Sequence, residues 1–147
     1  MYEVEKSLGF LLAKAYQRAF ALYKAELETF DVTPPQLGIL HFLWQQDGMT
    51  QVELSEKSQV DRTTLGGLID RLEKSGMVER HPHPHDRRAH QIRLTARGKE
   101  LQAPLTDCSK RSLAKFTVGL SEADIAALIR MLEILRGEER IYEKPVY

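Results

Sequence analysis

Arginine and histidine side chains gather between Arg80 and Arg93, and this short segment holds four of the five histidines of the chain. Closely spaced arginines suit contacts with the phosphates and grooves of nucleic acids. Alternate histidines on an extended segment could instead share one metal ion; they are His81, His83, His85 and His90. Because no second cluster of cysteines or acids accompanies them, and prolines hold the segment open, we expect no metal site. We expect these histidines to be solvated or to add pH-dependent positive charge near phosphates.

Cys108 is the only cysteine, so the chain forms no internal disulfide. No activating base can be assigned to it, and only Lys110 and Arg111 are basic neighbours in the sequence, so a cysteine hydrolase and a redox sensor are both disfavoured. The sequence also lacks a glycine-rich phosphate loop, a serine nucleophile elbow and a His-Glu-x-x-His motif. We therefore expect no enzyme and no cofactor.

Two short helices precede the arginine- and histidine-rich segment. Thr50-x-x-Glu53 is a capping box that starts a helix reaching about Lys57. After a turn, Asp61 offers its carboxylate as the next N-cap, and Gly76 ends the second helix. The apolar residues of the second helix share one face and are Leu65, Leu68, Ile69 and Leu72. Two helices across a tight turn predict a helix-turn-helix.

The other face of the second helix is small and polar at its start and mostly basic at its end. It holds Thr63, Gly67, Asp70 and Lys74, flanked by Thr64, Gly66 and Arg71. A glycine inside a helix costs about 1 kcal/mol relative to alanine, so the glycines make sense where a bulky partner approaches closely. Threonine hydroxyls can meet base edges or phosphates. The alternative is a plain surface helix on an all-α core.

A β-hairpin is predicted next, with strands at residues 77–81 and 89–94. Two prolines place residues 82–88 in a loop, because proline disfavours helices and central strands alike. A helix-turn-helix followed by an arginine-tipped hairpin is a winged helix. Arginine at the tip of a wing suits the minor groove, where narrow A·T tracts concentrate negative potential.

Long apolar helices flank this region. Residues 1–30 read as one long helix whose apolar band is too wide for a single neighbour. Thr33-Pro34-Pro35-Gln36 starts a second helix that ends near Gly48. Residues 95–117 form another long helix, capped by Thr95 and bent at Pro104. Ser121 caps a last helix that ends at Gly137.

The apolar stripes near both ends of the chain need a cover. The simplest cover is a second copy related by a two-fold axis. We also expect the tail at residues 138–147 to dock on a neighbour, since it carries Ile141, Tyr142, Val146 and Tyr147. A dimer would set two recognition helices about 34 Å apart, which suits an inverted repeat in double-stranded DNA.

The stretch VDRTTLGGLIDRLEKSGMVERHPHPHDRRAHQIRLTARGKEL and the order of elements around it resemble the MarR family of bacterial transcription regulators. The most specific motif is Asp-x-Arg at Asp86-Arg87-Arg88, followed by Leu-Thr-x-x-Gly at Leu94. The resemblance implies a mainly α fold with a small β-hairpin wing. It implies one domain over residues 1–147, with a winged helix-turn-helix at 34–95 and dimerisation helices at 1–33 and 96–147. The Pro-His-Pro-His before the motif is richer in histidine than is usual in the family.

The resemblance also assigns roles to residues. The second helix would enter the major groove, and the residues placed there are Arg62, Thr63, Thr64, Gly67 and Arg71. Arg88 would reach the minor groove from the wing tip with Asp86 steadying it, and the expected phosphate contacts are Lys74, Arg80 and Arg87. Such proteins are homodimers, and the reading that follows is a homodimeric repressor.

Family members often release DNA when a small molecule binds between the dimerisation helices and the winged domain. The candidate residues for such an effector cleft are Tyr16, Arg18, Phe20, Tyr23, His41 and Trp44. Aromatic rings with one His or Arg would favour a phenol or an aryl carboxylate; the alternative is that these residues are simply core. Relatives that sense peroxides carry a cysteine in the first helix, which has none here.

The net charge is +0, which is low for a DNA-binding protein, but its distribution is uneven. Residues 50–99 carry 10 Lys and Arg against 7 Asp and Glu, a net of +3, and the rest of the chain carries −3. No apolar run approaches a membrane span, and the composition suits a cytoplasmic protein. The alternatives to a ligand-released repressor are a metal-responsive regulator using the wing histidines and a winged-helix module for protein contact.

Overall fold

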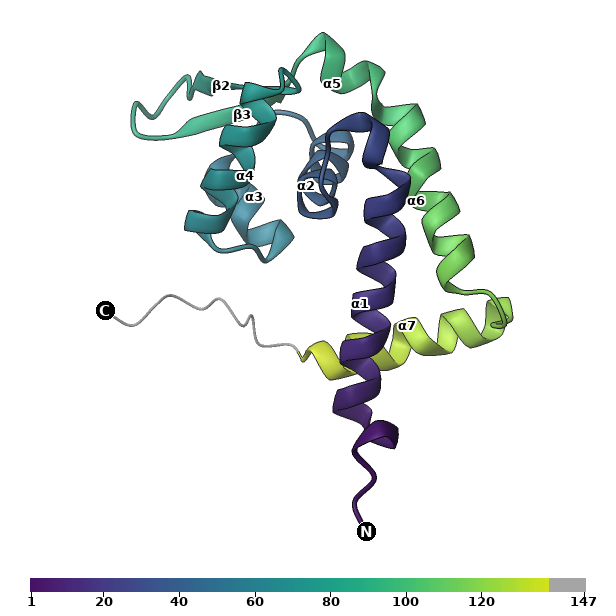
Figure 1. Ribbon diagram of the computed structural model, residues 1–147. Helices are drawn as coiled ribbons and strands as arrows, with labels where there is room; N and C mark the ends of the chain where they lie inside the picture. The colour runs from purple at the N-terminus through teal and green to yellow at the C-terminus, as the bar shows by residue number, and fades with distance from the viewer. Residues whose placement is uncertain (138–147) are drawn as a thin grey trace.

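The computed structural model describes residues 1–137, so the expected docking of the tail lies outside the described residues. Helices make up most of this part, with one small sheet (Figure 1). The helical elements are η1 (Val4–Lys6), α1 (Leu8–Glu26), η2 (Glu28–Phe30), α2 (Pro34–Gln45), α3 (Gln51–Ser58), α4 (Arg62–Lys74), α5 (Ala96–Glu100), α6 (Gln102–Phe116) and α7 (Glu122–Arg136). The strands are β1 (Met49–Thr50), β2 (Val78–Pro82) and β3 (His90–Leu94). The prediction of a mainly α fold with a hairpin wing is confirmed.

The helix starts follow the capping residues that the sequence indicates. Thr33, Thr50 and Ser121 each close a full capping box, in which the third helical residue binds back to the cap. Asp61 caps α4 by accepting a hydrogen bond from the N–H of Thr64 at 2.9 Å. Gly76 follows α4 with φ of 75°, a conformation that favours glycine and ends the helix.

The first predicted long helix is interrupted at both ends. Ser7 separates η1 from α1 and accepts a hydrogen bond from Phe10, so it acts as a new N-cap. At the other end α1 passes into the short η2, and Asp31 stops the helical run with φ of 54°. The prediction of a single helix over residues 1–30 was therefore wrong, because the chain leaves the α-helix at Ser7 and again at Leu27.

The second predicted long helix divides at Leu101 and not at Pro104. Proline lacks an N–H and its ring meets the carbonyl four residues earlier, so it fits best in the first turn of a helix. Pro104 occupies that first turn of α6, and the chain changes direction just before it (Figure 1). Thr95 caps α5 as expected, accepting from the N–H of Gly98 at 3.1 Å.

The sheet has three strands in the order β1-β3-β2, all antiparallel. Strand β1, at Met49–Thr50, was not predicted; it pairs with Ile92 and Gln91 of β3. Pro82, expected in the loop, is the last residue of β2 opposite His90. It is tolerated there because β2 is an outer strand of this sheet and needs no inter-strand bond at every N–H.

The core lies where α2, α3, α4 and the base of the sheet meet (Figure 1). Its fully covered side chains include Leu37, Leu40, Leu43, Leu54, Leu65, Ile69, Leu72, Met77 and Ile92. Gly98 joins α5 to this core, because a Cβ at this position would overlap the carbonyl oxygen of Met77. Trp44 reinforces the junction by donating its indole N–H to the carbonyl of Gly98 at 2.9 Å.

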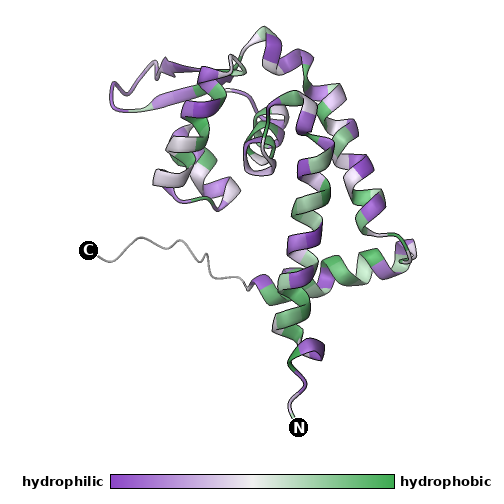
Figure 2. Ribbon diagram, in the orientation of Figure 1, coloured by the Kyte–Doolittle hydropathy of each residue, from purple (hydrophilic) through white to green (hydrophobic). Residues whose placement is uncertain are grey.

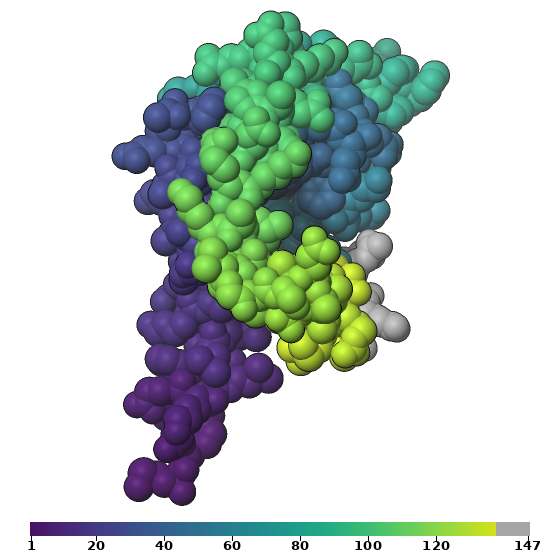
Figure 3. Space-filling view, turned by 90° about the vertical axis from the view of Figure 1, so that its right-hand side faces the viewer, coloured from purple at the N-terminus to yellow at the C-terminus, as the bar shows by residue number. Residues whose placement is uncertain are grey.

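The helices α1, α6 and α7 form an extended arm, and α6 joins this arm to the core through Leu105 and Cys108. The N-terminal part of α1 projects beyond the rest of the molecule (Figure 3). Apolar residues colour the lower half of α1 and most of α7 (Figure 2), yet neither helix contains a buried residue. Among residues 1–137, the helices all fall short of the length and apolar character that crossing a bilayer requires.

Candidate nucleic-acid interface

Helix α4 separates an apolar face from a polar face as its sequence predicts. Leu65, Leu68, Ile69 and Leu72 are buried, whereas Thr63, Asp70 and Lys74 are exposed. Gly67 is half-buried between these exposed residues, and a Cβ built on it would meet nothing within 4 Å. The polar face is therefore open enough for a bulky partner to approach the helix backbone.

The N-terminus of α4 presents two threonines in different states. The hydroxyl of Thr64 donates to Oδ2 of Asp61 at 2.7 Å, so its proton is already used. The backbone N–H and then the hydroxyl of Thr64 lower the pKa of Asp61, which keeps the cap charged. Thr63 and Arg62 are exposed beside it. At this end of the helix Arg62 and Thr63 are thus the side chains placed to donate to an incoming phosphate or base.

The wing, residues 78–94, is tipped by a tight turn. The carbonyl of Asp86 accepts from the N–H of Ala89 at 3.2 Å, which leaves Arg87 and Arg88 at the two central positions. Oδ1 of Asp86 also accepts from the N–H of Arg88 at 2.9 Å. Both arginines are exposed. The Asp-x-Arg motif therefore shapes the turn and directs two positive charges outward.

Arg80, which the sequence analysis placed among the phosphate contacts, has partners within the protein. Its guanidinium lies 2.7 Å from Oδ1 of Asp70 and 3.0 Å from Oε1 of Glu73, both on α4. Its side chain is only 23% exposed. The pairing was missed because Asp70 was read only as part of the exposed face. The signal was the spacing of Gly66, Asp70 and Glu73, which puts them on one stripe of the helix.

The wing histidines make separate contacts and do not converge on one point. His81 pairs with Glu79 at 3.0 Å. His83 accepts from the N–H of His85 at 3.1 Å, and their rings stand edge to face with centroids 6.1 Å apart. Within residues 1–137 no group of three or more His, Cys, Asp or Glu side chains gathers around a common point.

Three of the residues proposed for an effector cleft do come together. Tyr23 donates to Oγ of Ser109 at 2.6 Å, and Nε2 of His41 lies 3.0 Å from the same oxygen. The Ser109 hydroxyl donates to the carbonyl of Leu105, so the proton of the His41 contact belongs to Nε2. Trp44 stands edge-on to His41, with ring centroids 5.1 Å apart. This cluster joins α1, α2 and α6.

Burial lowers the pKa of His41, so the neutral imidazole is favoured in this cluster. Ser109 was not predicted as a member. Ser109 lies four residues after Leu105 in a predicted helix, and this spacing was the sequence signal for an inward-facing polar residue.

The other three candidates lie elsewhere. Tyr16 is 69% exposed and Phe20 is 36% exposed, along the open side of α1. Arg18 donates to the carbonyls of Phe116 and Lys115 at 3.1 and 3.2 Å, so it covers the C-terminal end of α6. The predicted set therefore divides into a buried polar cluster, an exposed aromatic pair and a helix-capping arginine.

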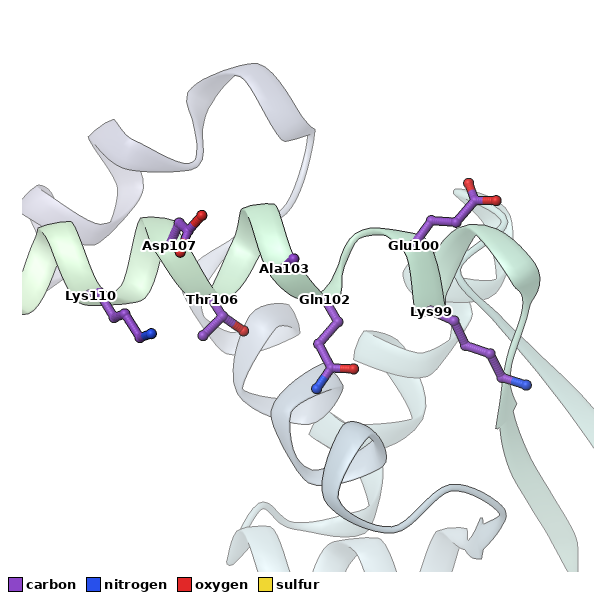
Figure 4. Close-up of a pocket in the computed structure, with 7 residues that line it drawn as sticks. All are labelled: Lys99, Glu100, Gln102, Ala103, Thr106, Asp107 and Lys110. Carbon is purple, nitrogen blue, oxygen red and sulfur yellow. The ribbon is translucent and has the colours of Figure 1, made fainter.

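A shallow pocket of about 420 Å³ lies along α5 and α6. Lys99, Gln102, Thr106 and Lys110 point to one side of these helices, whereas Glu100 and Asp107 point to the other (Figure 4). The lining of the pocket therefore carries two lysines and two carboxylates, so its formal charge is balanced.

Cys108 is 1% exposed and belongs to the core. Its thiol lies 3.4 Å from the carbonyl of Glu26 and 3.3 Å from the guanidinium of Arg111. The carboxylate of Glu26 binds Lys115 at 2.6 Å and Arg111 at 3.0 Å, and these two cations lower its pKa. These contacts fasten α1 to α6.

Comparisons with known proteins agree with this geometry. The profile of the MarR family matches residues 32–90. The transcriptional repressor NicR of Pseudomonas putida is 30% identical over 132 residues, covering 89% of this chain and 83% of NicR.

Two solved structures share this arrangement over most of the chain. A mutant MarR from E. coli in complex with operator DNA is 29% identical, with a TM-score of 0.78 over 87% of this chain and 92% of that one. BpsR from Bordetella bronchiseptica, whose DNA binding is regulated by 6-hydroxynicotinic acid, has a TM-score of 0.88 over 95% of this chain and 99% of its own. BpsR is 24% identical, so that likeness supports the fold. The chain belongs to the MarR family and is a DNA-binding transcription regulator.

Proposed function

We propose that this regulator is a homodimeric repressor that binds an inverted repeat and leaves it when a small aromatic or carboxylate ligand binds. The observation that carries the DNA-binding mode is the pairing of two open basic surfaces, the polar face of α4 and the arginine-tipped turn of the wing. Each is built on a rigid element, and together they offer positive charge to both grooves of a duplex.

In the proposed docking mode, α4 enters the major groove. Its open face at Gly67 admits the groove wall, with Thr63, Thr64 and Arg71 near base edges and Arg62 at the helix start. Arg88 enters the minor groove, and Arg87 and Lys74 meet phosphates. Asp86 holds the turn that presents Arg88. The DNA-binding region in this proposal is residues 34–95.

The dimer is proposed from the uncovered apolar surface of the arm. Leu8 and Leu11 of α1 are 64% and 51% exposed, and Ile134 and Leu135 of α7 are 66% and 57% exposed. Residues 1–33 and 96–137 would therefore pack against the same elements of a second copy, in a closed two-fold interface. Two such copies would present two α4 helices to successive turns of DNA.

The effector is proposed to bind at one of two places. The first is the Tyr23–Ser109–His41 cluster, whose polar atoms lie between the arm and the winged helix-turn-helix. The second is the α5–α6 pocket with Lys99 and Lys110 (Figure 4). A ligand at either place would contact α6 of the arm. Helix α5 connects α6 to strand β3 of the wing. The NicR relative is a repressor, and repression is proposed here by that similarity.

Selection of genomic fragments by the purified protein tests the proposal. Recovered fragments should share an inverted repeat, and affinity should fall by about 10³ to 10⁵ between 50 and 200 mM salt if 6–10 phosphates are contacted. A thermal-shift screen of aryl carboxylates and phenols should then find compounds that stabilise the protein and release the fragment. Fragments without a shared repeat, bound equally at both salt concentrations, would contradict the DNA-binding mode.

A further inference from the structure

The side chain of Arg80 lies along helix α4 instead of projecting from the wing. Its guanidinium contacts Asp70 at 2.7 Å, Glu73 at 3.0 Å and the carbonyl of Gly66 at 3.4 Å. The three partners occupy successive turns of α4, so one planar guanidinium with several N–H groups spans them.

Glu73 binds Arg80 a second time through the backbone. Oε2 of Glu73 accepts from the N–H of Arg80 at 3.1 Å, while Oε1 accepts from its guanidinium. Arg80 sits on β2, an outer strand of the sheet, and its backbone N–H binds Glu73 instead of the neighbouring strand. The carboxylate therefore satisfies the free edge of the wing and ties that edge to α4.

The charges on α4 give this contact a direct bearing on DNA binding. Asp70 is 68% exposed on the same face as Thr63 and Lys74, where a bare carboxylate would repel phosphates. Arg80 neutralises part of that charge. Its own side chain is largely covered, so little of its guanidinium is free to reach a phosphate.

We infer that Arg80, Asp70 and Glu73 form a brace that sets the position of the wing relative to α4, and that Arg80 is a positioning residue and not a phosphate contact. The brace keeps the minor-groove arginine of the wing in register with the major-groove face of α4. It rests on the proposed docking mode, but the geometry it describes exists without DNA.

Hydrogen exchange of the DNA-free protein is the first test. Arg80→Ala and Asp70→Asn should both speed amide exchange across residues 78–94 while leaving exchange in α1 and α6 as in the wild type. Glu79→Gln is the matched control, because it removes a neighbouring wing carboxylate whose partner is His81, and it should leave the exchange of the wing unchanged. If Arg80→Ala does not fold, Arg80→Lys, which retains the charge but lacks the planar fork, should show a smaller increase.

DNA affinity is the second measurement, because the brace and simple charge repulsion predict opposite changes in the affinity of Asp70→Asn. Asp70→Asn removes a negative charge that faces DNA, so simple electrostatics predicts tighter binding, whereas the brace predicts binding weakened about tenfold through loss of the wing contacts. Footprinting on a recovered fragment should lose the wing protections and retain those of α4. Unchanged wing exchange in both variants, or tighter binding by Asp70→Asn, would overturn the inference. If Arg80→Ala leaves the exchange of the wing unchanged but lowers the slope of log affinity against log salt concentration by about one phosphate contact, Arg80 is a phosphate contact instead.

Discussion

Asp86 and Arg88 are joined by a hydrogen bond of 2.9 Å from the backbone N–H of Arg88 to Oδ1 of Asp86. The bond lies inside the turn that Asp86 and Ala89 close, so the aspartate shapes the turn and leaves the guanidinium of Arg88 unused by this contact. In this motif Asp86 orders the backbone of the turn, and the side chain of Arg88 is exposed to solvent.

Arg88→Ala should weaken binding to a recovered operator fragment by about tenfold or more, because it removes the charge proposed to enter the minor groove. Its oligomeric state and melting temperature should match the wild type, since the side chain is exposed. Fluorescence anisotropy with labelled DNA measures the affinity. Arg130→Ala, an exposed arginine on α7, is the control that should bind as the wild type does; equal affinity for both variants would refute the assignment of the wing tip.

Gly67→Ala should change stability and DNA affinity in opposite directions. The new methyl group has open space around it and helix α4 favours alanine by about 1 kcal/mol, so the melting temperature should rise by roughly 2–4 °C. The same methyl group would hold the major groove away from the helix, so DNA binding should weaken. Gly38→Ala in α2 also has open space and serves as the control. It should leave DNA affinity unchanged, and a Gly67→Ala variant of full affinity would show that the groove does not approach here.

Leu132→Glu should convert the dimer into monomers, because it places a charge in the apolar stripe of α7 that is proposed to be buried between two copies. DNA affinity should fall with it, since two linked recognition helices bind better than one. Val52→Glu is a control of equal exposure, both side chains being 41% exposed, but it lies on α3 outside the arm. Light scattering should report a dimer for Val52→Glu; a dimer for Leu132→Glu as well would place the interface elsewhere.

His41 should make stability depend on pH in one direction. Burial lowers its pKa in the folded protein, so the unfolded chain binds more protons below about pH 6.5 and stability falls as the pH drops through that range. Above this range His41 is neutral in both states, and its contribution to the free energy of unfolding is fully present. Melting temperatures measured from pH 7.5 to 5 should therefore decline less for His41→Gln than for the wild type. Parallel curves for the two proteins would show that another group controls the decline.

Much of the local structure was predictable because its causes lie within a few residues. The caps at Thr33, Thr50, Asp61 and Thr95 each act on the next turn of chain, and the 3- and 4-residue spacing of leucines in α4 selects its buried face. The Asp-x-Arg turn is similarly local. These features sufficed to predict the winged helix-turn-helix and the open face of α4.

The helices predicted over residues 1–30 and 95–117 were wrong for local reasons, whereas the omissions concern contacts between distant residues. Strand β1 is two residues long and exists only because β3 lies beside it. Ser109 gained its role from Tyr23 and His41, which approach it from two other helices.

Arg80 shows most clearly what each source of information can decide. Its charge and its place in the wing follow from the sequence alone, and both suggest a phosphate contact. Whether the guanidinium turns outward or lies on α4 depends on the distance and angle between the wing and that helix, which are set when the sheet packs on the core. The sequence by itself determined which elements form and which faces are polar, because helix caps and periodicity are short-range. Only the tertiary structure decided which of the polar groups remain available to a partner, because ion pairs between elements depend on how those elements pack.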